Sequence, residues 1–328
     1  MNCHLHTLHL REPFRIAHGT SSTRQVLRIQ QDSHTVEAPF VPYYGENPDE
    51  TLRIVTQAVL PQKLPQTASL AFNLLRHDIL CTAQNQPLSS IAADSLGSAG
   101  VVPPGCRSLG IPDDLAAFAD KVRALAADFR VLKLKLGSGD LGLDIATVSV
   151  ARMAAPEAQI MIDVNGGWDV VQAVSMIEKL AEYEPALIEQ PIHHRHGIDA
   201  WIDLRANLSA KAPPIFADES AQTAADVEAL APYVDGVNVK LLKCGSFDGA
   251  VAMIAAARKH SLRVLLGCMI ETSLGVTTAA HLAPWADWID LDGHFYVAND
   301  DFDGLYYDKG TLLMPQRPGI GARSITPA

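Results

Sequence analysis

An α/β fold, a (β/α)8 TIM-type barrel preceded by a smaller N-terminal α+β domain, is predicted by three features of the sequence. From residue 106 onward, short apolar segments alternate with amphipathic helical stretches. Eight such strand-and-helix units follow one another, which is the number that the barrel requires. The first hundred residues show no such alternation. A doubly wound open sheet is the alternative, but no G-x-G-x-x-G turn follows an early strand.

The predicted barrel strands are short runs of aliphatic and β-branched residues bounded by turn or polar residues, which is typical of buried strands. They cover residues 106–110, 131–136, 160–164, 186–190, 214–218, 237–241, 263–267 and 288–292. The clearest helices between them have apolar residues at helical spacing. These helices cover residues 170–183, 223–233 and 247–260. Strands that alternate with helices in this way form a parallel sheet.

The N-terminal region follows a different pattern. Residues 10–30 predict a strand, a loop and a second strand, and residues 49–60 and 66–84 predict helices. A stretch rich in Gly and Pro, residues 97–105, separates this region from the barrel. The expected domains are an α+β domain (1–104), the barrel (105–294) and a C-terminal segment that packs back on the first domain (295–328).

Composition excludes several classes of protein. The formal net charge is −11 and no run of Lys and Arg occurs, so nucleic acid is not an expected partner. No apolar stretch is long enough to cross a bilayer, and residues 1–14 lack the basic head of a secretory signal. The five cysteines are scattered without a C-x-x-C pair, which fits a reducing compartment. We therefore expect a cytoplasmic enzyme without membrane contact.

Ionisable residues stand near the carboxyl ends of successive predicted strands. Side chains alternate along a strand, so Lys133 and Lys135 share one face, and Asp290 and Asp292 share one face of the last strand. This charged face is expected at the barrel mouth, where catalytic groups of this fold lie. Solvated strand ends or structural ion pairs would explain any one of these residues, but not a series. The remaining members of the series are Asp163, Glu189, Asp218 and Lys240.

Three carboxylates, Asp163, Glu189 and Asp218, come from adjacent predicted strands. Oxygen ligands of this kind suit Mg²⁺, which keeps coordination positions open for water or substrate. Zinc is less favoured because neither His nor Cys belongs to the set. His193, His194 and His196 follow Glu189 and are interpreted as a solvated loop rather than as metal ligands.

Lys135 and Lys240 flank these carboxylates in strand order. A neutral lysine is a competent general base when neighbouring cations lower its pKa, and Lys133 and a bound metal would supply such cations. A proton next to a metal-bound carboxylate leaves an enediolate when it is removed. Two bases on opposite faces of one carbon allow removal on one face and return on the other. The pattern therefore predicts racemisation or epimerisation.

Five motifs in order make the resemblance to a known family specific. KLKLG (133–137), IDVNGGW (162–168), IEQP (188–191), ADES (217–220) and VNVKLLKCGS (237–246) resemble the motifs of the enolase superfamily, muconate-lactonising subgroup. GCMIETSLGVTTAAH (267–281) and DLDG (290–293) are similar to the corresponding stretches of dipeptide epimerases, such as L-Ala-D/L-Glu epimerases. The resemblance extends to the N-terminal region, which would then be the family's α+β capping domain.

The resemblance implies a role for each matching residue. It implies Mg²⁺ as cofactor, since this superfamily uses a Lys or His base with Mg²⁺ that stabilises an enediolate. It implies a dipeptide substrate, epimerised at the α-carbon of its C-terminal residue. The implied metal ligands are Asp163, Glu189 and Asp218, and the implied acid/base pair is Lys135 and Lys240. The implied substrate-binding residues are Lys133, Cys268 and Ile270, with Asp290 and Asp292 holding the free ammonium group.

Two departures from the family concern the substrate. Members that act on Ala-Glu are expected to have an Arg in the first capping loop, where this chain has His18, and the first barrel strand, CRSLG (106–110), is unusual. An unperturbed His is only partly charged at neutral pH, and Glu46 would repel an acid. We therefore expect a neutral, apolar or basic second residue in the dipeptide, unless Arg15 or Arg24 supplies the missing charge.

Other functions remain as alternatives. An N-acylamino acid racemase, an o-succinylbenzoate synthase or a cycloisomerase of the same subgroup would share the metal and both lysines. Their substrates carry no free ammonium group at the place of Asp290 and Asp292, which favours the dipeptide epimerase. A non-catalytic barrel that binds a carboxylate is more remote, because no lysine or metal ligand is lost. The sequence leaves open whether the chain forms homo-oligomers.

Overall fold

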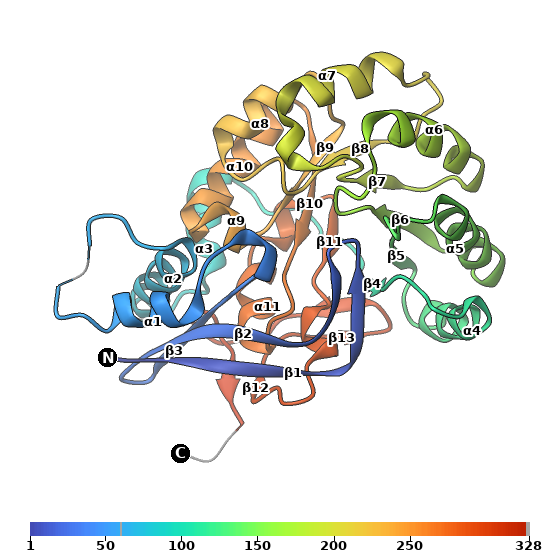
Figure 1. Ribbon diagram of the computed structural model, residues 1–328. Helices are drawn as coiled ribbons and strands as arrows, with labels where there is room; N and C mark the ends of the chain where they lie inside the picture. Colours follow the sequence, from blue (N-terminus) through green and yellow to red (C-terminus); the bar gives the residue numbers. More distant parts are fainter. Residues whose placement is uncertain (60, 326–328) are drawn as a thin grey trace.

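Eight parallel strands form the centre of the structure, a computed structural model that describes residues 1–59 and 61–325. Neighbours along the chain are neighbours in the sheet throughout. The two end strands lie side by side, so the sheet curves into a barrel (Figure 1). The strands are β4 (Cys106–Leu109), β5 (Val131–Lys135), β6 (Gln159–Asp163), β7 (Leu187–Glu189), β8 (Ile215–Ala217), β9 (Gly236–Val239), β10 (Arg263–Gly267) and β11 (Trp288–Asp290).

Helices follow the strands and cover the outside of the barrel. Their first turns carry side-chain caps for the free backbone N–H groups, such as the reciprocal capping boxes Asp169–Gln172 and Thr223–Asp226. The helices are α4 (Leu115–Ala126), α5 (Leu141–Ala154), α6 (Val170–Leu180), α7 (Gly197–Asn207), α8 (Ala224–Leu230), α9 (Leu241–Cys244), α10 (Phe247–Lys259) and α11 (Ser273–Ala280).

The barrel interior is closed at one end by a layer of apolar side chains, one from each of six strands. The layer consists of Cys106, Val131, Met161, Leu187, Phe216 and Leu265. Two positions further along β5, Lys133 points to the same interior, whereas Leu132 and Leu134 pack with the helices outside. The predicted alternation on this strand is therefore confirmed. The floor of the barrel is apolar, and the charged groups lie toward the carboxyl ends of the strands.

The N-terminal region forms an antiparallel sheet that packs against helices. The sheet consists of β1 (Asn2–Ile16), β2 (Gly19–Gln31) and β3 (His34–Pro39), and it lies across the mouth side of the barrel. The helices are α1 (Pro48–Val55), α2 (Gln66–Ala83) and α3 (Ser89–Leu96). The fold predicted from sequence, a (β/α)8 barrel with an α+β capping domain, is confirmed, and the alternative of an open doubly wound sheet is wrong.

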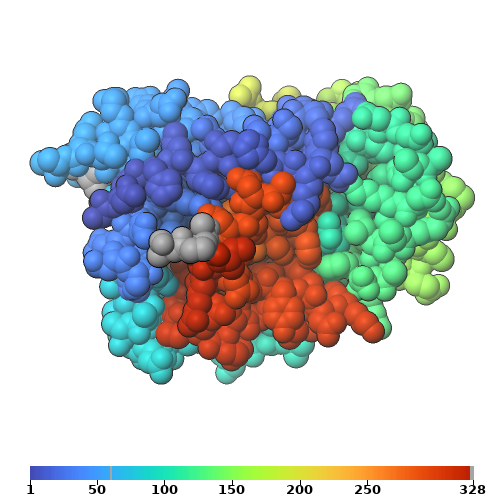
Figure 2. Space-filling view, turned by 90° about the horizontal axis from the view of Figure 1, so that it is seen from below, coloured from blue at the N-terminus to red at the C-terminus, as the bar shows by residue number. Residues whose placement is uncertain are grey.

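The C-terminal residues contact the capping domain, as Figure 2 shows from below. The guanidinium of Arg28 donates to both carboxylate oxygens of Asp301 at 2.7 Å, and the Ile320 N–H donates to Asp78. The short strands here are β12 (Phe302–Asp303), β13 (Tyr306–Asp308), β14 (Thr311–Leu313) and β15 (Arg323–Ser324). Residues 326–328 of the predicted C-terminal segment lie outside the described residues. The boundaries at 104 and 294 stay predictions.

Most predicted elements end one or more residues earlier than expected, and three of these ends are described here. The helix predicted over residues 49–60 ends at Val55, because the Gln57 N–H donates to Ile54 O, three residues back, instead of continuing the four-residue pattern. Residue 60 itself lies outside the described part of the chain. Strand β9 ends at Val239 because Lys240 is already the residue that precedes α9. The last strand ends at Asp290, and Asp292 precedes a short 3-10 helix, Gly293–Tyr296. No helix within residues 1–59 and 61–325 is long and apolar enough to span a membrane.

A buried ion network joins the capping domain to the barrel. Glu37 of β3 pairs with Arg28 at 3.2 Å and accepts hydrogen bonds from the backbone N–H and hydroxyl of Thr272, which precedes α11. We expect Glu37→Ala to lower the free energy of unfolding by about 3 kcal/mol, because it leaves buried polar groups unpaired. The exposed pair of Asp303 with Arg317 offers a control, and Asp303→Ala should cost less than about 1 kcal/mol. Equal losses in chemical denaturation would contradict this view of the network.

Candidate active site

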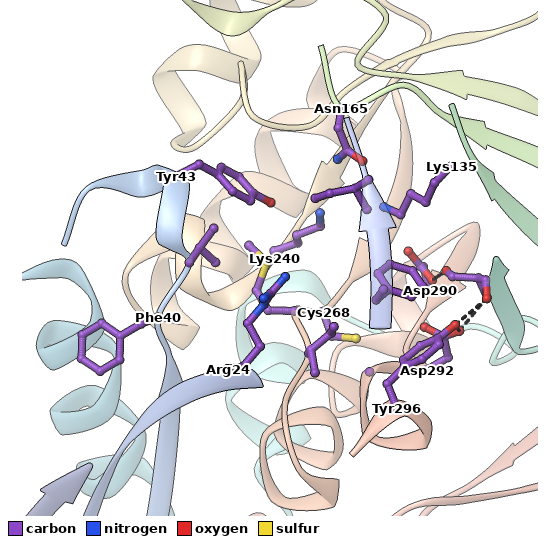
Figure 3. A pocket seen from close by; sticks show the side chains of 17 residues that line it. Arg24, Phe40, Tyr43, Lys135, Asn165, Lys240, Cys268, Asp290, Asp292 and Tyr296 are labelled. Carbon is purple, nitrogen blue, oxygen red and sulfur yellow. Dashed lines mark hydrogen bonds between the residues drawn. The ribbon is translucent and has the colours of Figure 1, made fainter. Parts of the chain in front are cut away.

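A cavity between the capping domain and the barrel mouth contains most of the residues expected to bind substrate (Figure 3). The capping domain contributes apolar and aromatic side chains and one arginine, Arg24. The barrel contributes polar and charged groups at the carboxyl ends of its strands. The barrel residues that line the cavity are Ser108, Lys135, Asn165, Lys240, Cys268, Met269, Ile270, Asp290, Asp292, Gly293 and Tyr296.

Three fully buried carboxylates lie together beside this cavity. Asp163, Glu189 and Asp218 each offer one oxygen, and these oxygens lie within 4.8 Å of one another. They come from the ends of β6, β7 and β8, where parallel pairing places Asp163 opposite Glu189. Glu189 Oε2 and Asp218 Oδ1 accept no hydrogen bond of good geometry, although each contacts an ammonium group. A buried oxygen of this kind suits a cation.

Burial and mutual repulsion shift the pKa values of these carboxyls in different directions. Burial raises the pKa of Glu189 to about 8, and the neighbouring Asp163 carboxylate adds to the shift. Burial alone would also raise the pKa values of Asp163 and Asp218, but lysine ammonium groups hold both well below the ordinary range. The negative charge of the site therefore depends on the cations around it.

The amino groups of Lys135 and Lys240 face the same cavity from different strands, as Figure 3 shows. Lys135 Nζ donates to Asp163 Oδ2 at 2.5 Å, and Lys240 Nζ donates to Asp218 Oδ2 at 2.6 Å. Burial would lower the pKa of Lys240, but Asp218 and Glu189 hold it well above the ordinary value. The expected lowering of a lysine pKa thus requires an additional cation beside these carboxylates.

Lys133 is fully buried beneath the cavity rather than exposed in it. Its ammonium group lies 2.7 Å from Glu189 Oε2, 2.7 Å from Asp290 Oδ2 and 3.2 Å from Asp163 Oδ2. It does not line the cavity, and in this structure it joins two of the carboxylates of the triad to Asp290. Its implied contact with substrate stays a prediction.

Three supporting residues were missed in the sequence analysis. The ammonium group of Lys243 donates to the backbone oxygens of Asp218 and Asn238 and lies 2.6 Å from Asp218 Oδ1. Asn238 Nδ2 donates to Glu189 Oε1 at 2.7 Å, and Gln190 Oε1 accepts from the Asp218 N–H. The alternation along β9 was the signal for the contact of Asn238 with Glu189, because it turns the Asn238 side chain to the barrel interior between the apolar Val237 and Val239.

Asp290 and Asp292 come together, although not through strand alternation. Asp290 Oδ1 accepts from Ser108 Oγ at 2.9 Å, and Asp292 Oδ2 accepts from the Ser108 N–H at 2.6 Å. Tyr296 OH donates to Asp292 Oδ2 at 3.0 Å. These bonds connect β11 and its following turn to β4, where the barrel closes. The argument that both carboxylates share a strand face is wrong, because the strand ends at Asp290.

The histidine loop contains no second metal cluster. The His193 and His194 rings stack with centroids 4.4 Å apart, and His18 approaches His193 at 6.1 Å from the capping domain. Within the described residues, the carboxylate triad is the one group found that could hold a metal ion. His193 and His194 are half-buried and His196 is exposed. That these histidines form a loop without a metal stays a prediction.

Comparisons with known proteins identify the family of this chain. Residues 115–324 match the family described as enolase C-terminal domain-like. The chain is 39% identical over 224 residues to the L-Ala-D/L-amino acid epimerase of Pedosphaera parvula, covering 66% of this chain and 62% of that relative. It is 30% identical to the L-Ala-D/L-Glu epimerase of Bacteroides thetaiotaomicron, covering 97% of this chain and 86% of the relative. The chain thus spans about six tenths of the length of the first of these relatives.

A solved structure extends the likeness to the whole fold. The dipeptide epimerase of Enterococcus faecalis V583, complexed with Mg and the dipeptide L-Leu-L-Tyr, superimposes with a TM-score of 0.85. The two chains are 25% identical, and the superposition covers 98% of each. The capping domain is therefore part of the likeness, together with the barrel. The three relatives named above are called epimerases, and this chain belongs to the enolase superfamily.

Proposed function

We propose that this chain is a Mg²⁺-dependent dipeptide epimerase that inverts the α-carbon of the C-terminal residue. One observation carries the proposal: two lysine amino groups face one cavity, each anchored by a different carboxylate of a single triad. The names of the relatives support the reaction class. Incubation of L,L-dipeptides with the protein and Mg²⁺, followed by chiral chromatography, tests the activity. A complete lack of L,D-product over a broad dipeptide set would contradict it.

The triad fits a divalent cation, because three buried carboxylates share a space and two of their oxygens lack a hydrogen bond. Asp163, Glu189 and Asp218 would hold the ion. When bound, Mg²⁺ supplies positive charge that offsets the charge of an enediolate and favours a neutral lysine nearby. Hard oxygen ligands without nitrogen or sulfur favour Mg²⁺ over zinc.

The proposed reaction removes one proton from the α-carbon and then adds another to its opposite face. One of Lys135 and Lys240, in its neutral form, takes the α-proton, and the electron pair of the broken C–H bond delocalises into the carboxylate as an enediolate. The other lysine, as ammonium, donates its proton to the opposite face of that carbon. The two lysines have then exchanged protonation states, and the reverse reaction starts from the product.

Asp290 and Asp292 are proposed to bind the free ammonium group of the dipeptide. Both line the cavity, and burial together with the nearby Asp290 raises the pKa of Asp292 to about 6. An ammonium group between them would offset this repulsion. Their bonds to Ser108 and the ion pair of Asp290 with Lys133 fill only part of their acceptor capacity, since each carboxylate has four lone-pair sites. Cys268 and Ile270 line the same wall and are proposed to contact the peptide.

We expect Asp292→Asn to raise the KM for free dipeptides by roughly 10- to 100-fold, because it removes a charged acceptor worth about 1.5–3 kcal/mol. N-acetylated dipeptides lack the ammonium group and should be poor substrates of the unchanged protein. Steady-state kinetics on matched free and acetylated dipeptides measures both effects. Equal turnover of the two substrate forms would exclude this role and favour an N-acylamino acid racemase.

The structure alters the expectation for the second residue of the dipeptide. Glu46 does not face the substrate, because its carboxylate accepts hydrogen bonds from Gln66 and Thr67 at the start of α2. Burial lowers the pKa of His18, whose ring packs 4.3 Å from the Tyr43 ring, so this histidine is neutral. Arg15 does not line the cavity and pairs with Asp113 at 2.6 Å. None of these three residues sets the charge of the site that would hold the side chain of the second residue.

Arg24 decides it. Its guanidinium lines the cavity, is half-buried and donates to the backbone oxygen of Thr23. Across the described chain, no carboxylate lies within ion-pair distance of it. A partly buried cation without a partner favours an anionic ligand. We therefore propose an acidic second residue, in place of the neutral, apolar or basic one expected from sequence.

Arg24→Met should lower kcat/KM for L-Ala-L-Glu by about 30-fold, from the loss of roughly 2 kcal/mol of charge-assisted hydrogen bonding. Turnover of L-Ala-L-Leu should change little, because Met preserves the apolar stem of the side chain. The exposed Arg53 of α1 provides a control for the loss of one positive charge. If the unchanged protein prefers L-Ala-L-Leu to L-Ala-L-Glu, the proposal for Arg24 is wrong and the apolar lining of Ile16 and Phe40 decides specificity.

A further inference from the structure

Arg107 is a largely buried cation behind the cavity, in the first barrel strand, β4. It pairs in register with Leu132, so its side chain leaves the strand on the outer, helix-facing side. Its guanidinium carbon lies 4.1 Å from the Phe295 ring centroid and 5.7 Å from that of Phe129. The side chain is 16% exposed, and its Nε atom has no hydrogen-bond partner.

The charge of Arg107 needs an anion, because stacking on aromatic rings offsets only part of the cost of burying it. Asp292 is the carboxylate that the structure places there, with its Oδ2 atom 3.6 Å from Arg107 Nε. Within residues 1–59 and 61–325, no second carboxylate forms an ion pair with this guanidinium. Arg107 and Asp292 are therefore opposite charges in an ion pair on this side of the barrel.

Asp292 in turn has few groups that stabilise its ionised form. Burial and Asp290 disfavour the carboxylate, whereas the Ser108 N–H, Arg107 and the Tyr296 hydroxyl favour it. Of these three, only Arg107 carries a full positive charge. The other titratable groups around it bring no cation in direct contact. They are Lys133, which pairs with Asp290, and the uncharged Cys106, Cys268, His294 and Tyr307.

We infer that Arg107 is a positioning residue for Asp292: from outside the barrel it keeps this carboxylate ionised and fixed, ready to bind a substrate ammonium group. The part of the inference that concerns the substrate ammonium group rests on the proposed function. The geometry of the Arg107–Asp292 pair does not depend on it. It adds to the site a residue that neither lines the cavity nor touches substrate. The alternative is that Arg107 only packs between aromatic rings and stabilises the barrel closure.

A matched set of variants separates these two roles. Arg107→Met keeps the stem and removes the charge, and Arg107→Lys keeps the charge. Arg263→Met is the control, because Arg263 also stacks on two rings, 5.6 Å from Phe216 and 5.4 Å from Trp288, at the opposite end of the barrel. Loss of an aromatic-stacked arginine is common to Arg107→Met and Arg263→Met, but only the former removes the partner of Asp292.

The first readout is the pH dependence of kcat/KM for a free dipeptide. Loss of a cation at this distance raises the pKa of a carboxyl by about one unit, so the acidic limb should move to higher pH in Arg107→Met. At pH 6 the ionised fraction of Asp292 would fall from about one half to about one tenth, a roughly fivefold loss in kcat/KM through KM. Arg107→Lys and Arg263→Met should keep the limb of the unchanged protein. Equal shifts in all three variants would assign the effect to packing and overturn the inference.

The second readout does not require activity. Protein labelled with ¹³C at aspartate carboxyls gives a signal for Asp292, assigned by its loss in Asp292→Asn, and its titration midpoint should rise by about one unit in Arg107→Met. An unchanged midpoint overturns the inference whatever the kinetics show. If no dipeptide is a substrate, the proposed function fails, while this midpoint still decides whether Arg107 sets the charge of Asp292.

Discussion

Lys135→Ala and Lys240→Ala are each expected to lower kcat for epimerisation by at least about 10³-fold, since each removes one of two obligatory proton carriers. The remaining lysine still faces one side of the α-carbon. Each variant should therefore exchange the α-proton of one epimer with solvent deuterium without inverting it. The two variants should act on opposite epimers, because the two amino groups approach the cavity from different strands.

Proton NMR in D₂O, run separately with the L,L- and L,D-dipeptides, measures the exchange. Lys121→Ala is the control, because this exposed lysine pairs with Glu12 on the outside of the molecule. Circular dichroism verifies that each variant folds, since the ion pairs of Lys240 are buried and its loss leaves Asp218 with one fewer partner. Near-normal epimerisation by either lysine variant would rule out the two-base mechanism.

Asp218→Asn is expected to abolish turnover and to weaken Mg²⁺ binding by at least about 100-fold. It removes one of three anionic ligands from a buried site, and a neutral amide is a weaker ligand for a hard cation. Calorimetric titration with MgCl₂ and the activity assay give two independent readouts. Asp248→Asn is a suitable control, because Asp248 lies on α10 and pairs with His77 and Arg76, away from the triad.

Metal removal tests the same expectation on the unchanged protein. Exhaustive chelation should stop turnover, and added Mg²⁺ should restore it. Full activity after chelation would show that the carboxylate triad acts without a cation. In that case Lys133, Lys135, Lys240 and Lys243, which surround the triad in this structure, would be the sole source of positive charge.

The sequence was sufficient for the barrel, because a repeated strand-and-helix period is a local pattern. Strands β5, β7 and β8 lie within their predicted segments, and β6 begins one residue before its segment. The carboxylate triad was predictable for a related reason: the carboxyl ends of adjacent parallel strands meet at one edge, so Asp163, Glu189 and Asp218 had to converge once the barrel was known. The roles of these residues in metal binding and catalysis stay predictions.

Contacts between distant segments could not be predicted from local sequence patterns. Asp292 lies past the end of its strand, and it meets Asp290 through Ser108, which is 184 positions away along the chain. Lys243 resembles an ordinary helix lysine, yet it is fully buried among the backbone oxygens of Asp218, Ala221 and Asn238. Charge and spacing alone do not reveal such burial.

The expectation about the second residue of the dipeptide shows the same limit of local sequence patterns. The sequence places four residues in or near the capping loops: His18, Glu46, Arg15 and Arg24. It does not tell which of them faces the cavity. The structure pairs Glu46 with the start of α2 and Arg15 with Asp113, and it leaves Arg24 without a carboxylate partner on the cavity wall. Side-chain direction in loops depends on tertiary packing, which is why sequence reasoning favoured a neutral side chain.

Deuterium incorporation into dipeptides tests the central claim most directly. A set of L,L-dipeptides is incubated with the protein and Mg²⁺ in D₂O, and mass spectrometry with fragmentation locates any added mass. Epimerisation through Lys135 and Lys240 predicts one deuterium at the α-carbon of the C-terminal residue, in both epimers, for free dipeptides and most rapidly for those with an acidic second residue. Absence of deuterium from every dipeptide, or its appearance at the N-terminal residue, would contradict the account.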